Sequence, residues 1–481
     1  MFRRNSLLLL PLWYGCITSF YIFIASAQIP SAIQTQFYSH PNTQFMHFSI
    51  CTFIDCQWDT TIPNATVFNP TDLDTDQWMS TAVLWGADTV CLTVRHVDGF
   101  ALWPTKSSPY NIAAATNFQN GTGDIVQDFV TSARKFGINP CFYIILGFNI
   151  YANHTNVPGP QYLQDQQLAL TELLTNYGPI SRLWWDNYAL DARLYQPVTH
   201  EGFICDNNIL GPSCPGWTAV IETVRSLAPN TLIIPGPDGC LVDGENLEGQ
   251  YPVYRNGNYG SYGCYFSTSP TNNSSTFLGI ESDFSILNPG DRWFYDNGVI
   301  MDSTSIWSTL TLKRGQGANI IFNIPPDTRG RIPDNIVATL AQYREIYDGT
   351  YTNPIASLSA PVSGICSNTS NNPFSIIIPA DPTRTFDQIV LQEDMSINGQ
   401  IINGYTLELQ DNTTQEWTKL NAHGITIGAQ VIDYGYGKLT NVKNIRFNCT
   451  ASIPGTPSTT PATLHSLNAY LGAPFIGSTT V

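Results

Sequence analysis

Short apolar runs alternate with stretches of helical periodicity along most of the chain. The runs are rich in β-branched and aromatic residues, as is typical of buried parallel strands. They cover residues 45–53, 87–94, 140–146, 183–186, 231–235, 277–281 and 318–324. Helical spacing marks residues 124–136, 161–178, 217–227 and 333–347. This alternation predicts an α/β fold, a (β/α)8-like barrel of the TIM type, with irregularity allowed because not all eight units are distinct.

The pattern changes after about residue 352. Helical periodicity is lost, and short runs of alternating apolar and polar residues follow, separated by Gly, Asn, Asp and Pro. The clearest runs are 374–378, 388–392, 405–409 and 442–447. Such runs predict a β-sandwich. We therefore expect a leader at 1–27, a catalytic barrel at 28–352 and a sandwich at 353–481.

The first 27 residues have the organisation of a secretory signal peptide. Arginines precede an apolar run over residues 7–24, and a small-residue cleavage site at 25–27 precedes Gln28. An uncleaved anchor is the alternative, but a proline and a glycine interrupt the run, which favours cleavage. We expect a secreted or lysosomal/vacuolar protein without stable membrane association after cleavage. Eight Asn-X-Ser/Thr sequons agree with secretion, at Asn64, Asn120, Asn153, Asn272, Asn273, Asn368, Asn412 and Asn448.

Cysteine usage also suits an oxidising compartment. Loss of the signal peptide leaves ten of the eleven cysteines, an even number. Cys51 with Cys56 and Cys205 with Cys214 are close enough in sequence to pair locally. Cys366 and Cys449 could close the sandwich. The full connectivity cannot be read from the sequence.

Composition narrows the choice of partner. The chain has 21 basic and 37 acidic residues, a net charge of −16. This charge repels phosphate backbones and anionic membranes, so no nucleic-acid partner is expected. The sequence has no Cys-X-X-Cys pair and no His-X-X-X-His, so we expect no zinc site and no cofactor. A neutral substrate such as a sugar remains compatible with all of this.

Polar residues recur where the predicted strands end. His47 lies in the first strand, residues 95–100 follow the second, Asp186 ends the fourth, residues 236–239 follow the fifth, and Glu281 ends the sixth. Any one of them could be a capped or salt-bridged structural residue. Their recurrence at the same end of successive strands predicts a site at the carboxyl end of the barrel.

Carboxylates without metal ligands or a phosphate-binding loop favour glycoside hydrolysis. That reaction needs one ionised carboxyl group to attack the anomeric carbon and one protonated group to protonate the leaving oxygen. Tryptophans near the strand ends could stack on sugar C–H surfaces, although a large barrel also buries many aromatic side chains. The candidates are Trp58, Trp103, Trp184, Trp185 and Trp293.

Several segments in order resemble the α-L-fucosidase family of retaining glycoside hydrolases. Residues 45–49 (FMHFS) resemble its FIHFG, and residues 68–78 (FNPTDLDTDQW) resemble FNPT-x-LD-x-x-QW. Residues 92–106 (LTVRHVDGFALWPTK) are similar to LT-x-KHHDGF-x-LWPSK. Residues 183–186 (LWWD) are similar to the segment that holds the nucleophile. The remaining matches are 121–126, 236–246, Glu281, 292–295 and 318–327.

The resemblance implies roles for individual residues. Asp186 would be the nucleophile that forms a covalent fucosyl-enzyme, and Glu245 the general acid and base. Glu281 is the fallback acid/base and Glu248 a second rival. The two catalytic carboxyl groups would stand about 5 to 5.5 Å apart. The substrate-binding candidates are His40, His47, Trp58, His96, Trp103, Trp185 and Trp293.

The segment at 236–246 is closest to the branch that acts on α-1,3/4-linked fucose, so a fucosylated oligosaccharide or glycoprotein glycan is the implied substrate. Three departures affect substrate preference: Val97 replaces a histidine, residues 57–59 replace Glu-Trp-Gly, and residues 146–149 replace Ser-Pro-Trp-Asp. A weakened fucose-binding protein and a hydrolase for another sugar are the alternatives. Residues 386–394 and 426–428 resemble a galactose-binding-like sandwich, for which we favour a structural role over glycan binding.

Overall fold

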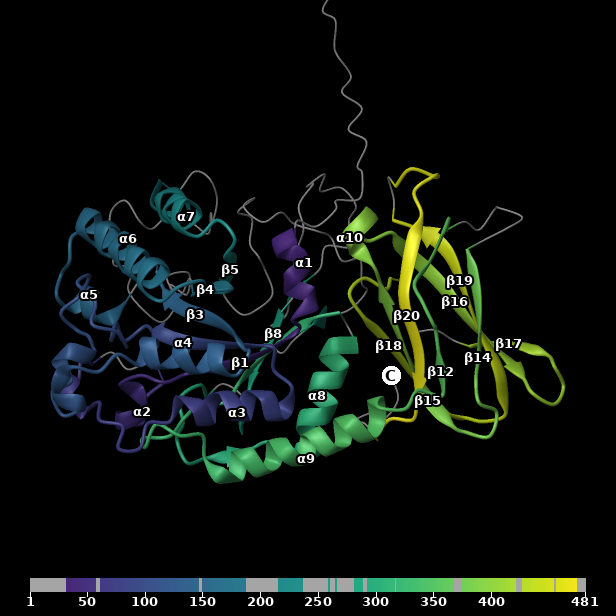
Figure 1. Ribbon diagram of the computed structural model, residues 1–481, viewed down its shortest axis with the longest axis horizontal. Helices are drawn as coiled ribbons and strands as arrows, with labels where there is room; N and C mark the ends of the chain where they lie inside the picture. Colours follow the sequence, from purple (N-terminus) through teal and green to yellow (C-terminus); the bar gives the residue numbers. More distant parts are fainter. Residues whose placement is uncertain are drawn as a thin grey trace, which may run out of the picture.

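The computed structural model describes residues 32–57, 61–146, 149–186, 215–236, 258–259, 264–265, 281–288, 292–315, 317–366, 374–420, 426–453 and 456–473. An α/β unit and an all-β unit lie side by side in these residues (Figure 1). The signal peptide expected at 1–27 lies outside them. No helix in the described part of the chain has both the length and the apolar character needed to cross a bilayer.

The α/β unit is built on a parallel sheet of seven strands in the order β5-β4-β3-β2-β1-β11-β8. β1 pairs with β2 on one side and with β11 on the other, so the first and last strands of the unit are neighbours. The pairing of first and last strands is characteristic of a barrel, and the fold is (β/α)8-like, as predicted; among the described residues β5 and β8 are the edges of the sheet. The strands are β1 (Asn42–Met46), β2 (Thr89–Arg95), β3 (Asn139–Ile145), β4 (Arg182–Asp186), β5 (Leu232–Gly236), β8 (Glu281–Ser285) and β11 (Asn319–Asn323).

Two predicted strands are wrong in position. The run at 45–53 overlaps β1 only at Phe45 and Met46, and its last residues belong to the helix α2 (Cys51–Ile54). The apolar run at 277–281 was expected to end at Glu281, whereas β8 begins at Glu281 and pairs with β11 over its whole length. The strand itself, with the sequence ESDFS, carries too few apolar residues to be recognised by its composition. A short hairpin, β6 (Asn258–Tyr259) with β7 (Cys264–Tyr265), lies between β5 and β8 in the sequence, and β9 (Leu287–Asn288) pairs with β10 (Val299–Ile300).

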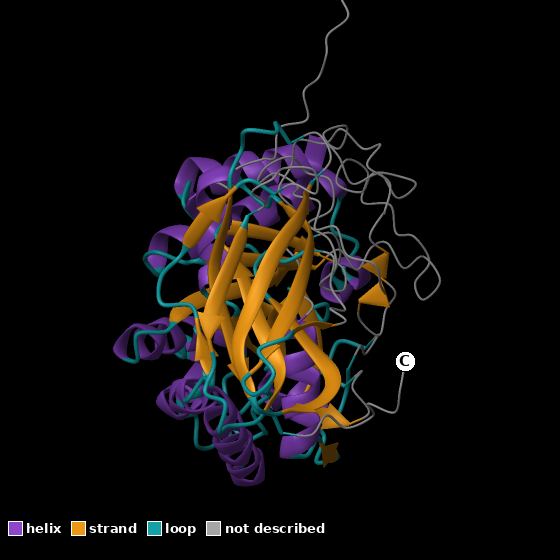
Figure 2. Cartoon of the chain, turned by 90° about the vertical axis from the view of Figure 1, so that its right-hand side faces the viewer, coloured by secondary structure: helices purple, strands orange, loops and turns teal. Residues whose placement is uncertain are grey.

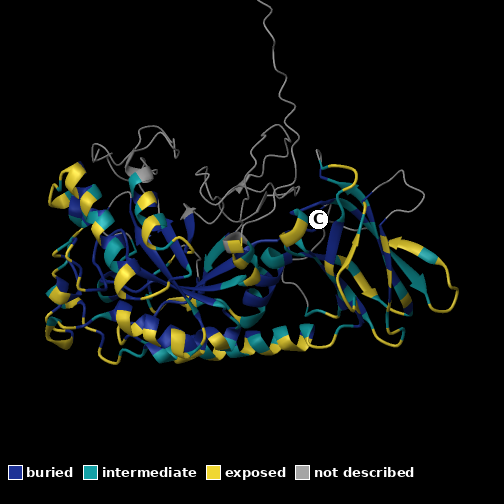
Figure 3. Ribbon diagram, turned by 45° about the horizontal axis from the view of Figure 1, so that its top comes forward, coloured by how far each residue is buried: buried dark blue, intermediate teal, exposed yellow. Residues whose placement is uncertain are grey.

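Helices cover the outside of the barrel. They are α3 (Thr75–Trp85), α4 (Ile125–Lys135), α6 (Gly159–Asn176), α7 (Pro215–Leu227), α8 (Ser303–Gly315) and α9 (Asp334–Tyr351), with the shorter α2 (Cys51–Ile54) and α5 (Ile150–His154) in loops. The predicted helices at 124–136, 161–178, 217–227 and 333–347 correspond to four of these. Every residue of β2 is buried, because the strand packs against helices on one side and against the barrel interior on the other (Figure 3).

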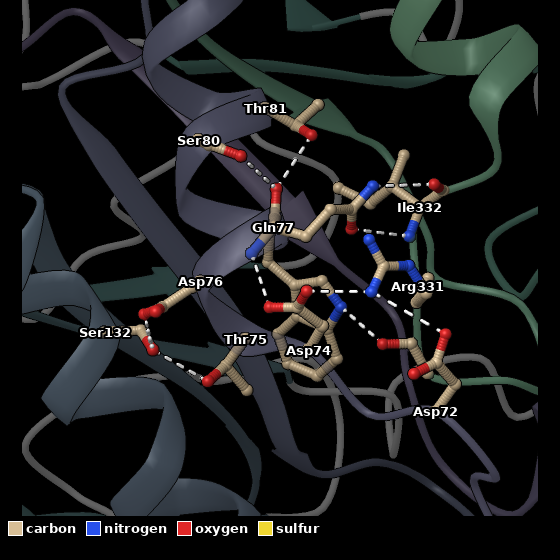
Figure 4. A network of polar contacts seen from close by, with 12 residues as sticks. Asp72, Asp74, Thr75, Asp76, Gln77, Ser80, Thr81, Ser132, Arg331 and Ile332 are labelled. Atoms are coloured by element: carbon tan, nitrogen blue, oxygen red, sulfur yellow. Dashed lines mark hydrogen bonds and ion pairs between the residues drawn. The ribbon is translucent and has the colours of Figure 1, made fainter.

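The segment at 68–78, part of the family resemblance, pins α3 to the loop after β11 (Figure 4). Asp74 caps α3 by accepting from the Gln77 N–H, and its other oxygen lies 2.8 Å from Arg331 Nη1. Gln77 exchanges two hydrogen bonds with the backbone of Ile332, of 2.8 and 3.0 Å. The Trp78 indole donates to the carbonyl of Gly330. These residues therefore hold elements together rather than line the barrel interior.

The all-β unit is a sandwich of two antiparallel sheets (Figure 2). One sheet has the order β12-β20-β15-β18 and the other β14-β19-β16-β17, with a hydrophobic core between them. Three of the four predicted strand runs fall within β15, β16 or β19, and the run at 374–378 begins one residue before β14. The strands are β12 (Ala356–Ser357), β13 (Val362–Gly364), β14 (Ser375–Pro379), β15 (Phe386–Glu393), β16 (Ile402–Asp411), β17 (Trp417–Leu420), β18 (Val431–Leu439), β19 (Val442–Ser452) and β20 (Ala462–Tyr470), with α10 (Met395–Asn398) between β15 and β16.

Disulfide bonds occur in both units. The pairs Cys51–Cys56 and Cys366–Cys449 are formed, as expected from the sequence. Cys205 and Cys214 lie outside the described residues. A further bond joins Cys91 on β2 to Cys141 on β3, residues that face each other in the parallel register. This pairing depends on strand register across 50 residues, which spacing along the chain does not reveal.

Candidate active site

Side chains from four barrel strands and one loop gather at the carboxyl end of the barrel, which we call the mouth. His47 follows β1 and His96 follows β2, and their ring centroids are 5.3 Å apart. Tyr143 of β3 stacks on His96 at 5.4 Å, and Trp184 of β4 stacks on Tyr143 at 5.3 Å. We call this group, completed by Phe45, Trp293 and Phe294, the mouth cluster.

The tautomer of His47 is set by Asn323 at the end of β11. Asn323 Nδ2 donates to the Ser285 hydroxyl and to the Trp293 carbonyl, so its oxygen faces His47. His47 Nδ1 therefore donates to that oxygen, over 2.9 Å, and Nε2 is left as the acceptor. Burial lowers the pKa of His47 to about 3, against the opposing effect of the Asn323 hydrogen bond. The ring is neutral at ordinary pH.

His96 is also held neutral. Burial, followed by the proximity of His47, lowers the pKa of His96 well below its usual value. Its Nδ1 is buried and has no hydrogen-bond partner within the described residues. Two neutral imidazoles therefore stand side by side at the mouth, able to hydrogen-bond sugar hydroxyls without presenting a positive charge.

Asp186 is the last residue of β4, paired in register with Ile145 of β3 and Gly236 of β5. The strand thus ends at the mouth, as the sequence predicted, while the side chain of Asp186 is outside what the structure describes. Trp58, Glu245 and Glu248 also lie outside the described residues.

Glu281 lies at the opposite end of the barrel from the mouth. As the first residue of β8, it is buried beside Arg182, the first residue of β4, with 3.7 Å between Oε1 and Nη1. The Trp184 indole donates to Glu281 Oε2 over 3.2 Å. Burial raises the pKa of Glu281, and Arg182 and Trp184 oppose this rise. The sequence had placed Glu281 at the carboxyl end of its strand, and the structure corrects that position.

Three other substrate-binding candidates also lie away from the mouth cluster. His40 precedes β1 at the amino end, where its carbonyl accepts from Arg182 Nη2. Trp103 is buried outside the barrel interior, with its indole donating to Glu172 of α6 over 3.0 Å. Trp185 belongs to the same outer core, because it alternates with Trp184 along β4. Of the seven candidates, the structure brings together His47, His96 and Trp293.

The sequence reasoning missed three members of the site, namely Tyr143, Phe294 and Asn323, and it named Trp184 only as one of five tryptophans that could stack on a sugar. A signal existed for the two strand residues. If Asp186 faces the barrel interior at the end of β4, period-2 alternation puts Trp184 on the same side. Tyr143 likewise shares a face with Cys141, which lines the interior.

The fold and the site define a (β/α)8-like barrel protein that carries neutral imidazoles and stacked aromatic rings at the end where barrel enzymes carry their active sites. Among the described residues no group of three His, Cys, Asp or Glu side chains is arranged to hold a metal ion.

Comparison with known proteins identifies the family. The sequence profile of the alpha-L-fucosidase family matches residues 26–345. The chain belongs to the alpha-L-fucosidase family. It is 26% identical over 337 residues to Alpha-L-fucosidase 1 of Arabidopsis thaliana, a match that covers 68% of this chain and 62% of that relative. The match thus spans about three fifths of the relative's length.

Solved structures share the fold. A Bacteroides ovatus protein named for the same family aligns with a TM-score of 0.74 at 23% identity, over 94% of this chain and 76% of its own. A Ruminococcus gnavus fucosidase of glycoside hydrolase family 29, solved in complex with fucose, aligns with a TM-score of 0.69 at 15% identity, over 93% of this chain and 96% of its own. The two-unit architecture is therefore shared across nearly the whole described chain.

Proposed function

We propose that this chain is a retaining α-L-fucosidase, with Asp186 as the nucleophile and Glu245 as the general acid and base. The observation that carries the proposal is the pair of neutral imidazoles, His47 and His96, within a stacked aromatic cluster at the strand ends where β4 delivers Asp186. Family membership supports the choice of sugar, since the Ruminococcus gnavus relative is a fucosidase solved with fucose.

In the first step, an Asp186 oxygen attacks the anomeric carbon, and the bond to the leaving-group oxygen breaks as Glu245 protonates that oxygen. The product is a covalent fucosyl-aspartate. In the second step, Glu245 takes a proton from water, the water oxygen attacks the same carbon, and the ester to Asp186 breaks. Two inversions leave the α configuration intact. Glu281 stays the fallback for the acid/base role, although its burial beside Arg182 makes it the weaker candidate.

The neutrality of the histidines matters for this reaction. Positive charge develops on the sugar ring in an oxocarbenium-like transition state. An imidazolium at the mouth would oppose that charge, whereas a neutral imidazole still accepts from or donates to a hydroxyl. Burial of His47 and His96 thus favours catalysis at the same time as it positions the rings.

We further propose that the substrate is a terminal α-1,3/4-linked fucose on an oligosaccharide or glycoprotein glycan, reached through the secretory pathway. The likeness of residues 236–246 to that branch supports the linkage, and the sequence of residues 1–27 supports secretion. The replacements at Val97, 57–59 and 146–149 shift preference among such glycans, because a buried hydroxyl that loses its partner costs about 1–3 kcal/mol.

The deciding experiment measures release of the aryl group from an aryl α-L-fucoside. Wild-type protein should turn over, and Asp186→Ala should lower kcat by about 10³-fold or more. Asp381→Ala, an exposed aspartate in a turn of the sandwich, is the matched control and should leave the rate unchanged. Fucose binding without turnover by the wild type would instead favour a weakened fucose-binding protein, and release of a different sugar from an aryl glycoside panel would reassign the substrate.

The acid/base assignment has its own test. Glu245→Gln should slow substrates with poor leaving groups far more than activated ones, by about 10²-fold or more, and azide should rescue it with formation of α-fucosyl azide. Glu281→Gln is the control. If Glu281→Gln behaves in this way and Glu245→Gln does not, the assignment of Glu245 is wrong.

A further inference from the structure

A cavity of about 300 Å³ lies between the barrel and the sandwich, away from the mouth. Asn42, the first residue of β1, and Arg314, near the end of α8, line it, so it opens at the amino end of the barrel. The face of the sandwich formed by β15, β18 and β20 supplies the opposite wall, as the juxtaposition of these strands with α8 and α9 indicates (Figure 1).

One wall of this junction cavity is a row of tyrosines. Tyr343, Tyr347 and Tyr351 are four residues apart on α9 and therefore share one face of the helix. Their ring centroids are separated by 6.2 and 5.0 Å along the row. Tyr470 of β20 continues it, 5.0 Å from Tyr351. The row offers extended aromatic surface beside polar hydroxyls.

The other wall is made of planar amides and a guanidinium. Ser466 donates to Gln392 Oε1 over 2.8 Å, and Gln392 Nε2 donates to Gln430 Oε1 over 3.3 Å. Arg314 Nη2 donates to the same oxygen over 3.4 Å. Arg314 Nη1 also donates to the Ala318 carbonyl and to Asn319 Oδ1, each over 3.3 Å. All of these Arg314 contacts and the Gln392–Gln430 contact are long, so the donors are held only weakly by the protein.

In the tyrosine row the Tyr351 hydroxyl donates to Gln388 Oε1 over 3.3 Å, whereas those of Tyr343 and Tyr347 are available to a ligand. Tyr343 is only 4% exposed and lines the cavity, yet its hydroxyl has no hydrogen-bond partner in the described part of the chain. Tyr347 is half-buried, and its described contacts are through its ring. Neither hydroxyl is among the fully enclosed polar atoms that lack a partner, so both are accessible and can hydrogen-bond to a ligand hydroxyl in the cavity.

We propose that the junction cavity is a second, non-catalytic binding site for a neutral saccharide unit. Aromatic faces accept the C–H surface of a sugar ring, while amides and a guanidinium hold its hydroxyls. The cavity volume is at the lower end of the range for ligand pockets, about 300–1,000 Å³, which suits one hexose-sized unit. The net charge of −16 disfavours an acidic sugar. The choice of a saccharide rests on the proposed function, since a second sugar site remote from the mouth would keep glycan-bearing material close to the enzyme.

The test uses the full chain and sugars that no fucosidase can cleave: the neutral tetrasaccharides of glucose, mannose, galactose and N-acetylglucosamine. Saturation-transfer NMR and calorimetry should detect binding of at least one of them to the wild type. Tyr347→Ala should weaken that binding by about tenfold or more, because stacking surface is lost. Tyr347→Phe, which keeps the ring, should weaken it by no more than about threefold.

Trp417→Ala is the matched control, because Trp417 is an aromatic residue on the other sheet of the sandwich, stacked against Arg446. It should leave tetrasaccharide binding unchanged. If Tyr347→Ala lowers the melting temperature strongly, Gln392→Ala replaces it, with the same expected loss. The proposal is overturned if no neutral tetrasaccharide binds, if binding survives both variants, or if only an acidic oligosaccharide binds. Release from an aryl α-L-fucoside, measured in parallel, reports on the mouth alone, so failure of the second site and failure of the proposed function are distinguishable.

Discussion

The two ends of the barrel interior both bury polar side chains among aromatic rings, but only the amino end pairs them as opposite charges. At the amino end, α1 (Ala32–Ser39) inserts Phe37, and Arg182 reaches Glu281, Thr43 and the carbonyl of His40. At the mouth, His47 and His96 are equally buried, but His96 Nδ1 finds no partner among the described residues. The amino end pairs opposite charges, since Glu281 Oε1 makes no hydrogen bond but lies 3.7 Å from Arg182 Nη1, whereas the buried imidazoles of the mouth are neutral and His96 Nδ1 has neither an ion pair nor a hydrogen bond among the described residues. The comparison teaches that burial alone does not mark a functional end, and that the charge state of the buried groups separates the two ends.

The largest expected effect comes from removing the cation of the buried ion pair between Arg182 and Glu281. Arg182→Met leaves the Glu281 carboxylate buried without its cation, and we expect the free energy of unfolding to fall by about 3–5 kcal/mol. Urea denaturation measures it. The double variant Arg182→Met/Glu281→Leu should cost less than the single variant, because it removes both charges.

The control for that experiment is Arg344→Ala, which removes a partly exposed ion pair with Asp348 on α9. It should cost only about 0.5 kcal/mol. An Arg182→Met cost as small as that of the control would mean that the amino end is not closed by the buried pair.

The next effect concerns the mouth. His47→Gln keeps an amide that can donate to Asn323 but removes the imidazole acceptor, so we expect kcat/KM for an aryl α-L-fucoside to fall by about 10²-fold, equivalent to about 2.7 kcal/mol. The free energy of unfolding should change by less than in Arg182→Met. His465→Gln, an exposed histidine of the sandwich, is the control. A large loss of stability with little loss of activity would assign His47 to the framework instead.

The buried histidines also predict how stability depends on pH. The pKa of His47 is about 3 in the folded chain against 6.5 in an unfolded one, and that of His96 is lowered in the same direction. The unfolded state therefore binds more protons between these values. The stabilisation is complete above pH 6.5 and is lost as pH falls, with a slope of about 1.4 kcal/mol per pH unit for each histidine.

Urea denaturation between pH 4.5 and 7 tests this expectation. His47→Gln should remove roughly one histidine's share of the slope, about 1.4 kcal/mol per pH unit. His465→Gln is again the control and should leave the slope as it is. A slope unchanged in His47→Gln would show that this imidazole is already charged or already exposed in the native protein.

The smallest effect is expected for the hydrogen bonds that join α3 to the loop after β11. Gln77→Ala removes two hydrogen bonds to the Ile332 backbone at a partly exposed site, for an expected loss of about 1 kcal/mol with unchanged kcat/KM on an aryl α-L-fucoside. Thermal unfolding and steady-state rates measure the two quantities. A fall in kcat/KM would mean that this network also positions the loop after β11 for catalysis.

Local patterns were sufficient for much of the architecture. Apolar runs and helical spacing predicted five of the seven main barrel strands, the last two residues of β1 and four helices, because a strand buried on both faces and an amphipathic helix each leave a recognisable signal. The position of β8 was predicted wrongly because its polar sequence, ESDFS, carries no such signal. Its position is set by pairing with β11. Cys51–Cys56 could be expected from proximity, whereas Cys91–Cys141 depends on register.

The sequence by itself determined which chemical groups the chain carries and that polar residues recur where strands end, and it supplied the motifs shared with the family. Only the tertiary structure decided which of those groups meet. His47, His96 and Trp293 converge, Trp103 turns outward to Glu172, and Glu281 sits at the opposite end of the barrel beside Arg182. The physical reason is that strand register and the pleat fix the level and the face of each side chain, and neither is written in local periodicity.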